Sequence, residues 1–126
     1  LSGSPRAIFL LIGTNDLPWY TDRNDTDILQ TYRKILECCQ AESPQTRVFV
    51  QSILPRHQRF SRRIQRLNGG LKELAEHFGY VYIDLYSHFV GDKGELRAEF
   101  NNDHLHLLGS GYALWVEILT PYLESL

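Results

Sequence analysis

The stretch A-I-F-L-L-I-G-T-N-D, from Ala7 to Asp16, decides the fold predicted for this chain. Its apolar part runs from Ala7 to Ile12 without alternation, and Gly13 closes it. Such a continuous apolar run is typical of a strand that is buried on both faces of a parallel sheet. A polar loop, residues 14–25, follows. We therefore predict a first strand whose carboxyl end opens directly into a polar loop.

The rest of the chain alternates between strand and helix signals. A β-branched strand is predicted over 47–53 and a short one over 81–85. Helical periodicity begins near Asp25, spans 61–78 and returns over about 110–124. The resulting order is strand, helix, strand, helix, strand, loop, helix. Because this order requires parallel crossover connections, it predicts one α/β domain.

Apolar side chains fall on one face of each predicted helix. In the first helix they are Ile28, Tyr32, Ile35, Leu36 and Cys39. The stripe of the second helix passes Gly69 and Gly70, each of which costs about 1 kcal/mol relative to alanine. In the last helix the side chains predicted to face inward are Tyr112, Trp115, Leu119 and Tyr122. Pro121 is expected to bend the end of that helix.

The composition excludes several classes of protein. The chain has 126 residues, of which 43% are hydrophobic and 22% charged, as in one ordinary globular domain. A net charge of −2 argues against nucleic acid as the main partner. No apolar run approaches the roughly 18 residues of a membrane span. The N-terminal residues do not resemble a secretory signal.

Two observations concern compartment and completeness. Cys38 and Cys39 are adjacent, and neighbouring residues rarely satisfy disulfide geometry, so we predict free thiols. Free thiols favour a reducing, cytoplasmic compartment, although export through a processed signal stays open. The chain contains no methionine and begins with Leu1. We therefore expect a fragment, a processed product or part of something longer.

Two polar motifs point to the carboxyl edge of the predicted sheet, where open parallel sheets form their sites. The first is G-T-N-D, residues 13–16, directly after the first strand. The second is D-H-L-H, residues 103–106, followed by L-L-G-S-G-Y at the start of the last helix. From their order and spacing we predict that the two motifs form one shared site.

These motifs resemble the third and fifth sequence blocks of the SGNH (GDSL-like) hydrolase family. The segments V-F-V-Q-S-I-L-P-R and Y-I-D-L-Y between them resemble the family as well. The resemblance covers nearly the whole chain and the C-terminal two-thirds of the family domain. The likeness is strongest to bacterial homologues of platelet-activating-factor acetylhydrolase subunits and of carbohydrate acetylesterases. It implies a three-layer, flavodoxin-like parallel sheet. Residues 1–126 would form a single domain that lacks its N-terminal strands.

The resemblance also implies roles for individual residues. His106 corresponds to the catalytic base, Asp103 to the carboxylate that orients it, and Asn15 to the oxyanion donor. Gly13 and Asp16 would support the oxyanion loop. Two aromatic residues follow that loop, Trp19 and Tyr20, and they line the substrate pocket or only cover the loop.

The nucleophilic serine of the family is missing from this chain, as is the glycine of its second block. Ser2 and Ser4 precede the first strand, which at about 3.3 Å per residue puts them roughly 20 Å from the site, at the wrong edge. Ser52 is interpreted as a polar residue that leaves the sheet. The apolar strand 7–12 would be an exposed edge, so we expect an N-terminal segment or a second chain beside it.

Simpler interpretations exist for each feature. His106 could cap a helix, Asn15 could shape a turn, and Asp103, His104 and His106 could bind a metal ion. The five arginines between 56 and 66 are expected to form a solvated helix face, with recognition of an anionic lipid head or sugar acid as the alternative.

The resemblance favours a serine esterase that removes a short acyl group, commonly acetyl, from a sugar or lipid ester through an acyl-enzyme. The partner implied is a small acyl ester, with no cofactor and no metal. A binding or assembly module that kept the fold without the nucleophile is the alternative.

Overall fold

The computed structural model describes residues 6–11, 25–100 and 109–126. Three strands form one parallel sheet in the order β1 (Ala7–Leu10), β2 (Arg47–Gln51), β3 (Val81–Ile83). The long helices are α1 (Asp25–Glu42), α2 (Ser61–Phe78) and α4 (Gly109–Glu124). The short elements are η1 (Gln58–Phe60), α3 (Tyr86–Phe89) and η2 (Ala98–Phe100). The predicted α/β order and the parallel sheet are confirmed, with each strand slightly shorter than expected.

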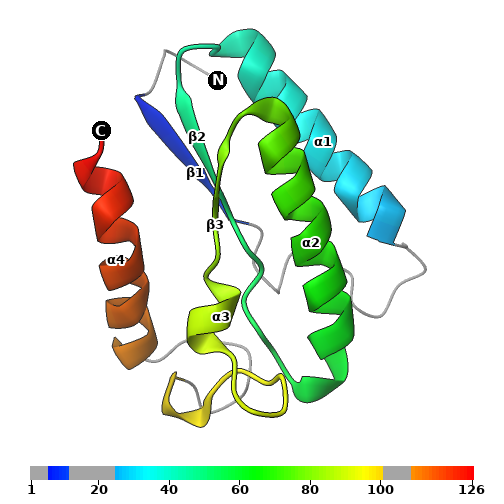
Figure 1. Ribbon diagram of the computed structural model, residues 1–126, viewed down its shortest axis with the longest axis vertical. Coiled ribbons are helices and arrows are strands. Elements are labelled where there is room, and N and C mark those ends of the chain that lie inside the picture. The colour runs from blue at the N-terminus through cyan, green and yellow to red at the C-terminus, as the bar shows by residue number, and fades with distance from the viewer. Residues whose placement is uncertain (1–5, 12–24, 101–108) are drawn as a thin grey trace.

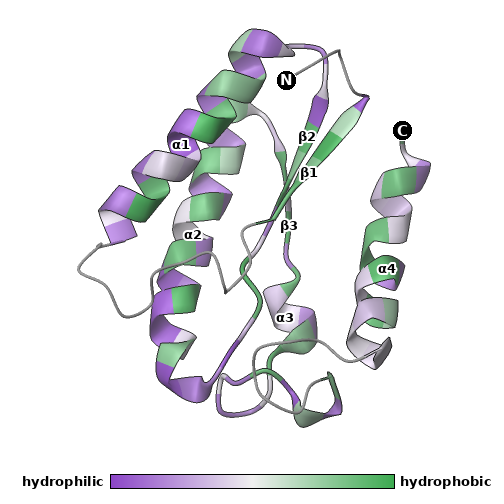
Figure 2. Ribbon diagram, turned by 180° about the vertical axis from the view of Figure 1, so that it is seen from behind, coloured by the Kyte–Doolittle hydropathy of each residue, from purple (hydrophilic) through white to green (hydrophobic). Residues whose placement is uncertain are grey.

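Helices cover both faces of the sheet, so the fold has three layers (Figure 1). The central strand β2 shows why. Val48 and Val50 pack with α1 and α2, whereas Phe49 between them packs with residues of α4. Because successive side chains of a strand point to opposite faces, one strand contributes to two hydrophobic cores. The reverse view shows α1 and α2 together on one side of the strands and α4 on the other (Figure 2).

Helices α1 and α2 pack closely against each other. Gly70 of α2 lies against the side chain of Leu29 of α1, and a methyl group added at Gly70 would overlap it. A methyl group at Gly69 would meet nothing within 4 Å. The helix continues through both glycines and ends at Gly79, whose φ of 73° is the left-handed conformation that glycine adopts readily. Gly70 is therefore a packing residue, whereas Gly69 is not.

Two residues assigned to buried helix faces are exposed. Ile35 of α1 is 38% exposed, although Ile28, Tyr32, Leu36 and Cys39 are buried as predicted. Tyr112 of α4 is 52% exposed, while Trp115, Leu119 and Tyr122 pack against the second core. In each helix the apolar face predicted to point inward therefore included one residue too many. The side chains that reach the sheet form a narrower face than the apolar pattern.

Cys38 and Cys39 are free thiols, as predicted, with Cys38 exposed and Cys39 buried. Burial raises the pKa of the Cys39 thiol, and the neighbouring Cys38 raises it further. Within the described ranges of the chain, no helix is long and apolar enough to cross a membrane.

Candidate active site

The seven residues predicted to form the site lie outside the described residues. They are Gly13, Asn15, Asp16, Trp19, Tyr20, Asp103 and His106. The structure does describe the strands and helices between which the two motif segments run. Segment 12–24 runs from the end of β1 to the start of α1, and segment 101–108 from η2 to the start of α4.

These attachment points lie toward one end of the molecule. The carboxyl ends of the strands and the N-terminal ends of α1, α2 and α4 all point toward the lower part of Figure 1. The parallel sheet requires this arrangement, because every crossover helix starts where a strand has just ended.

The two ends of segment 101–108 are held close together. The Ser110 hydroxyl in the first turn of α4 donates to the carbonyl of Glu99, at 2.7 Å. Phe100 is buried beside Phe89, with ring centroids 5.1 Å apart in an edge-to-face arrangement. The segment that carries Asp103 and His106 therefore leaves and returns at neighbouring points on a packed base.

The start of α1 is fixed by a shared carboxylate. Asp25 accepts from Arg63 Nε at 3.1 Å and from Arg66 Nε at 3.0 Å, so it joins the first turn of α1 to α2. The Asp25 side chain is 27% exposed. Since Asp25 follows residue 24, this pair of bonds fixes where segment 12–24 joins α1.

The arginine-rich segment therefore does more than form a solvated helix face. Arg63 and Arg66 bind Asp25, while the guanidinium groups of Arg56 and Arg59 lie 4.7 Å and 4.8 Å from the centroid of the Phe60 ring. Desolvation lowers the pKa of Arg56, and the neighbouring charge of Arg59 lowers it further. His57 accepts from the backbone N–H of Arg59 and so caps the short helix η1.

Ser52 is excluded as a nucleophile by its surroundings. It is fully buried, and its hydroxyl oxygen accepts from the backbone N–H groups of Leu85 and Tyr86, each at 2.9 Å. Burial also raises the pKa of neighbouring Tyr82 to about 12, with Asp84 adding to the shift and a hydrogen bond involving Ser52 opposing it. The Ser52 side chain therefore holds the start of α3 and is not open to a substrate.

Two buried amides, Gln51 at the end of β2 and Asn68 of α2, were not singled out by the sequence patterns. Asn68 accepts from the Ile53 backbone N–H at 2.7 Å and donates to the Ile53 carbonyl at 3.1 Å. Gln51 bonds to the end of β1 and to α4. The sequence signal that could have identified them is a polar residue within an apolar pattern. Asn68 interrupts the apolar stripe of a helix, and Gln51 interrupts an apolar strand. Buried polar side chains are usually hydrogen-bonded, so such interruptions mark structural junctions.

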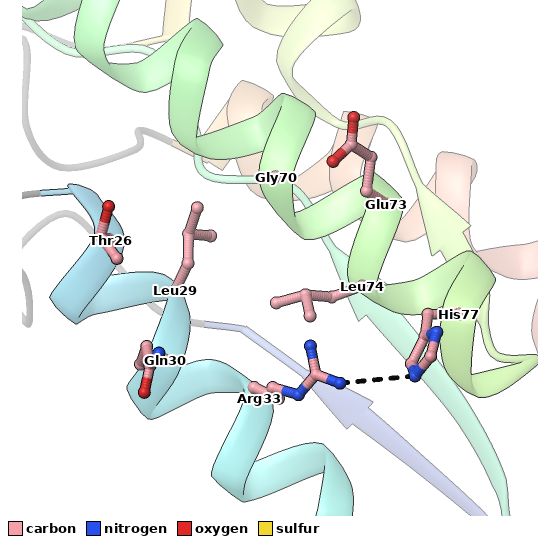
Figure 3. A pocket seen from close by; sticks show the side chains of 8 residues that line it. All are labelled: Thr26, Leu29, Gln30, Arg33, Gly70, Glu73, Leu74 and His77. Carbon is pink, nitrogen blue, oxygen red and sulfur yellow. Dashed lines mark hydrogen bonds between the residues drawn. The ribbon is translucent and has the colours of Figure 1, made fainter.

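A cavity of about 450 Å³ lies between α1 and α2, away from this edge. Its walls carry Arg33, Glu73 and His77 over an apolar floor that includes Leu29 and Leu74 (Figure 3). Arg33 Nη2 lies 3.5 Å from His77 Nε2. This cavity opens between the helices and does not involve the carboxyl ends of the strands. Among the residues that the structure describes, no group of three metal-binding side chains is found.

A sequence profile of the GDSL-like Lipase/Acylhydrolase family matches residues 1–114. With the parallel three-layer fold and the two motifs, this match shows that the chain belongs to that family. No curated protein sequence matches the chain.

Solved structures share the fold. A proposed platelet activating factor from Streptococcus pneumonia is 30% identical with a TM-score of 0.83. The match covers 96% of this chain and 61% of that one. A GDSL-like lipase from Bacteroides thetaiotaomicron is 21% identical, with a TM-score of 0.81 over 96% of this chain and 63% of that one. A proposed acylhydrolase from Bacteroides fragilis is 20% identical, with a TM-score of 0.82. The match covers 96% of this chain and 62% of that one. The chain thus spans about three fifths of the length of these structures.

Proposed function

We propose that this chain supplies the proton-transfer and oxyanion groups of a serine ester hydrolase, and that its substrate is a short acyl ester of a sugar or lipid alcohol. His106 acts as base and then as acid, Asp103 orients it, and Asn15 donates to the oxyanion. Family membership carries the reaction class. The observation that supports a single site is that both motif segments are attached at the carboxyl edge of one parallel sheet.

In the proposed reaction the serine oxygen attacks the ester carbonyl while His106 takes its proton. The tetrahedral intermediate carries its negative charge on an oxygen that Asn15 stabilises. His106 then protonates the leaving alcohol, which gives an acyl-enzyme, and a water molecule hydrolyses that intermediate by the same proton transfers in reverse. Gly13 and Asp16 support the oxyanion loop, and Trp19 and Tyr20 line the pocket for the substrate.

We further propose that residues 1–126 form one domain that is completed beside β1, where a further segment or chain supplies the serine. Two features support this. Every residue of β1 is only partly buried, and among the described strands β1 pairs with β2 alone. The outer face of α4 carries apolar side chains that are largely exposed, namely Tyr112, Val116 and Leu123. A covered edge would bury both surfaces.

The test is hydrolysis of p-nitrophenyl acetate, together with labelling by a fluorophosphonate, in the protein that contains the serine. His106→Ala should lower kcat by about 10⁴-fold or more, because the base acts in both chemical steps. His77→Ala is the matched control, since His77 lies between α1 and α2, and its kcat should stay at the wild-type value. An unaffected rate in His106→Ala would remove His106 from the mechanism. A folded, complete protein that neither hydrolyses esters nor reacts with the probe would favour the binding module.

A further inference from the structure

Gln51 is a buried amide that connects the neighbouring strand β1 to the helix α4. It is the last residue of β2 and is only 3% exposed. Its Nε2 donates to the carbonyl of Leu10, at 3.4 Å, and its Oε1 accepts from the indole Nε1 of Trp115, at 2.9 Å. One side chain thereby joins the last residue of β1 to α4.

The two elements joined by Gln51 lead into the two motif segments. Leu10 ends β1, and the chain continues from there to Asn15. Trp115 lies in α4, whose first residue, Gly109, follows the segment with Asp103 and His106. A shift of α4 relative to β1 would therefore move the attachment points of the two motif segments relative to each other.

The helix α4 buries fewer of its residues than α1 and α2 do. Of its residues only Gly111 is fully buried, whereas α1 and α2 bury several large side chains each. Apolar contact alone is non-directional and leaves a partly buried helix free to rotate or slide. The indole–amide bond adds a fixed direction, and because Gln51 is buried, the loss of its hydrogen-bond partner is costly.

We propose that Gln51 is a positioning residue that sets Asn15 relative to the Asp103–His106 pair. It acts through the Leu10 carbonyl and the Trp115 indole and touches no reacting atom. The roles of the three site residues rest on the proposed function, whereas the link between the two segments rests on the contacts of Gln51.

Two variants test the link in the ester-hydrolysing protein. Gln51→Met removes both hydrogen bonds at similar volume, and Trp115→Phe removes only the indole donor while it keeps an aromatic ring. Each should lower kcat by about 10- to 100-fold, because misplacement of about 1 Å at a reacting centre has an effect of that size. KM should change by less than about twofold. The double variant should be no slower than Gln51→Met, since Trp115→Phe removes a hydrogen bond that Gln51→Met has already removed.

Arg47→Met is the matched control. Arg47 Nη1 donates to the Ser125 carbonyl at 2.8 Å and to its hydroxyl oxygen at 3.1 Å. It therefore joins the first residue of the same strand to the residue that directly follows α4. This variant should lower stability and leave kcat within about twofold of wild type. An equal loss of kcat in Arg47→Met would overturn the proposal, as would wild-type kcat in folded Gln51→Met and Trp115→Phe variants.

A second readout separates this proposal from the proposed function. In isotope-labelled protein, the His106 imidazole and Asn15 side-chain amide signals should shift in Gln51→Met and in Trp115→Phe but not in Arg47→Met. Shifted signals in a protein that hydrolyses no ester would support the link while the proposed function fails. Unchanged signals in an active enzyme would refute the link alone. If Gln51→Met does not fold, the milder Trp115→Phe decides by the same criteria.

Discussion

The serine at the end of β2 illustrates how neighbours decide the role of a residue. Ser52 lies near the carboxyl edge, in the part of the sheet where nucleophiles are found, yet its oxygen already accepts two backbone N–H groups. The Leu85 N–H also bonds to the Ile83 carbonyl, whereas the Tyr86 N–H depends more on Ser52. Ser52 therefore has a structural role, although it lies at the edge of the sheet where catalytic residues are usually found.

Ser52→Ala should lower the free energy of unfolding by about 1–3 kcal/mol, because it leaves a buried donor without its acceptor. Urea denaturation of the folded chain measures this. Ser87→Ala is the control, since Ser87 is exposed and donates to Asp84, and it should change stability by less than about 0.5 kcal/mol. Loss of fluorophosphonate labelling in a folded Ser52→Ala protein would make Ser52 the nucleophile and contradict its structural role.

At the scale of elements, two adjacent glycines in α2 have different roles. Gly69 faces open space, whereas Gly70 permits the close approach of α1 at Leu29. The sequence pattern treats them alike, because helix propensity is a local property and the neighbouring helix is distant in sequence.

Gly69→Ala should raise the free energy of unfolding by about 0.5–1 kcal/mol, since alanine loses less backbone entropy in a helix. The free energy of unfolding of the Gly70→Ala variant should be lower than that of Gly69→Ala by at least about 1 kcal/mol, because Leu29 must adopt another position. Thermal and urea unfolding of both variants compare them directly. An equal rise in the free energy of unfolding in both variants would show that α1 and α2 are not in close contact at this point.

At the scale of the whole molecule, the β1 edge and the outer face of α4 are the surfaces that the proposed neighbour would cover. The strand β1 lies at one edge of the sheet, and α4 covers the face opposite α1 and α2 (Figures 1 and 2). The strand is apolar, and the outer face of α4 carries the exposed side chains of Tyr112, Val116 and Leu123. In solution the protein should therefore have a native mass above the 14.6 kDa of one chain, through a further segment, a second chain or self-association.

Native mass spectrometry and light scattering test this. Val116→Glu changes a side chain on the outer face of α4 that is 62% exposed, and it should weaken the association. Ile35→Glu is the control on the opposite layer, where the side chain is 38% exposed, and the association should persist. A monodisperse monomer of this chain with nothing bound would refute the covered edge.

The sequence alone predicted the order of strands and helices, the parallel sheet and the family. The apolar run at 7–12, the helical periods and the two motif segments are local patterns, and backbone geometry converts them into elements with little dependence on distant residues. The residues assigned to the site also came from the motifs, and their roles stay predictions that His106→Ala tests.

Only the tertiary structure decided which residues hold the elements together. Gln51 meets Leu10 and Trp115, Ser52 meets the start of α3, and Gly70 meets Leu29. These partners are far apart in the sequence, and no local pattern encodes which polar or small residue will face which neighbour. The physical reason is that a hydrogen bond or a close approach depends on three-dimensional placement, whereas periodicity depends on the chain alone.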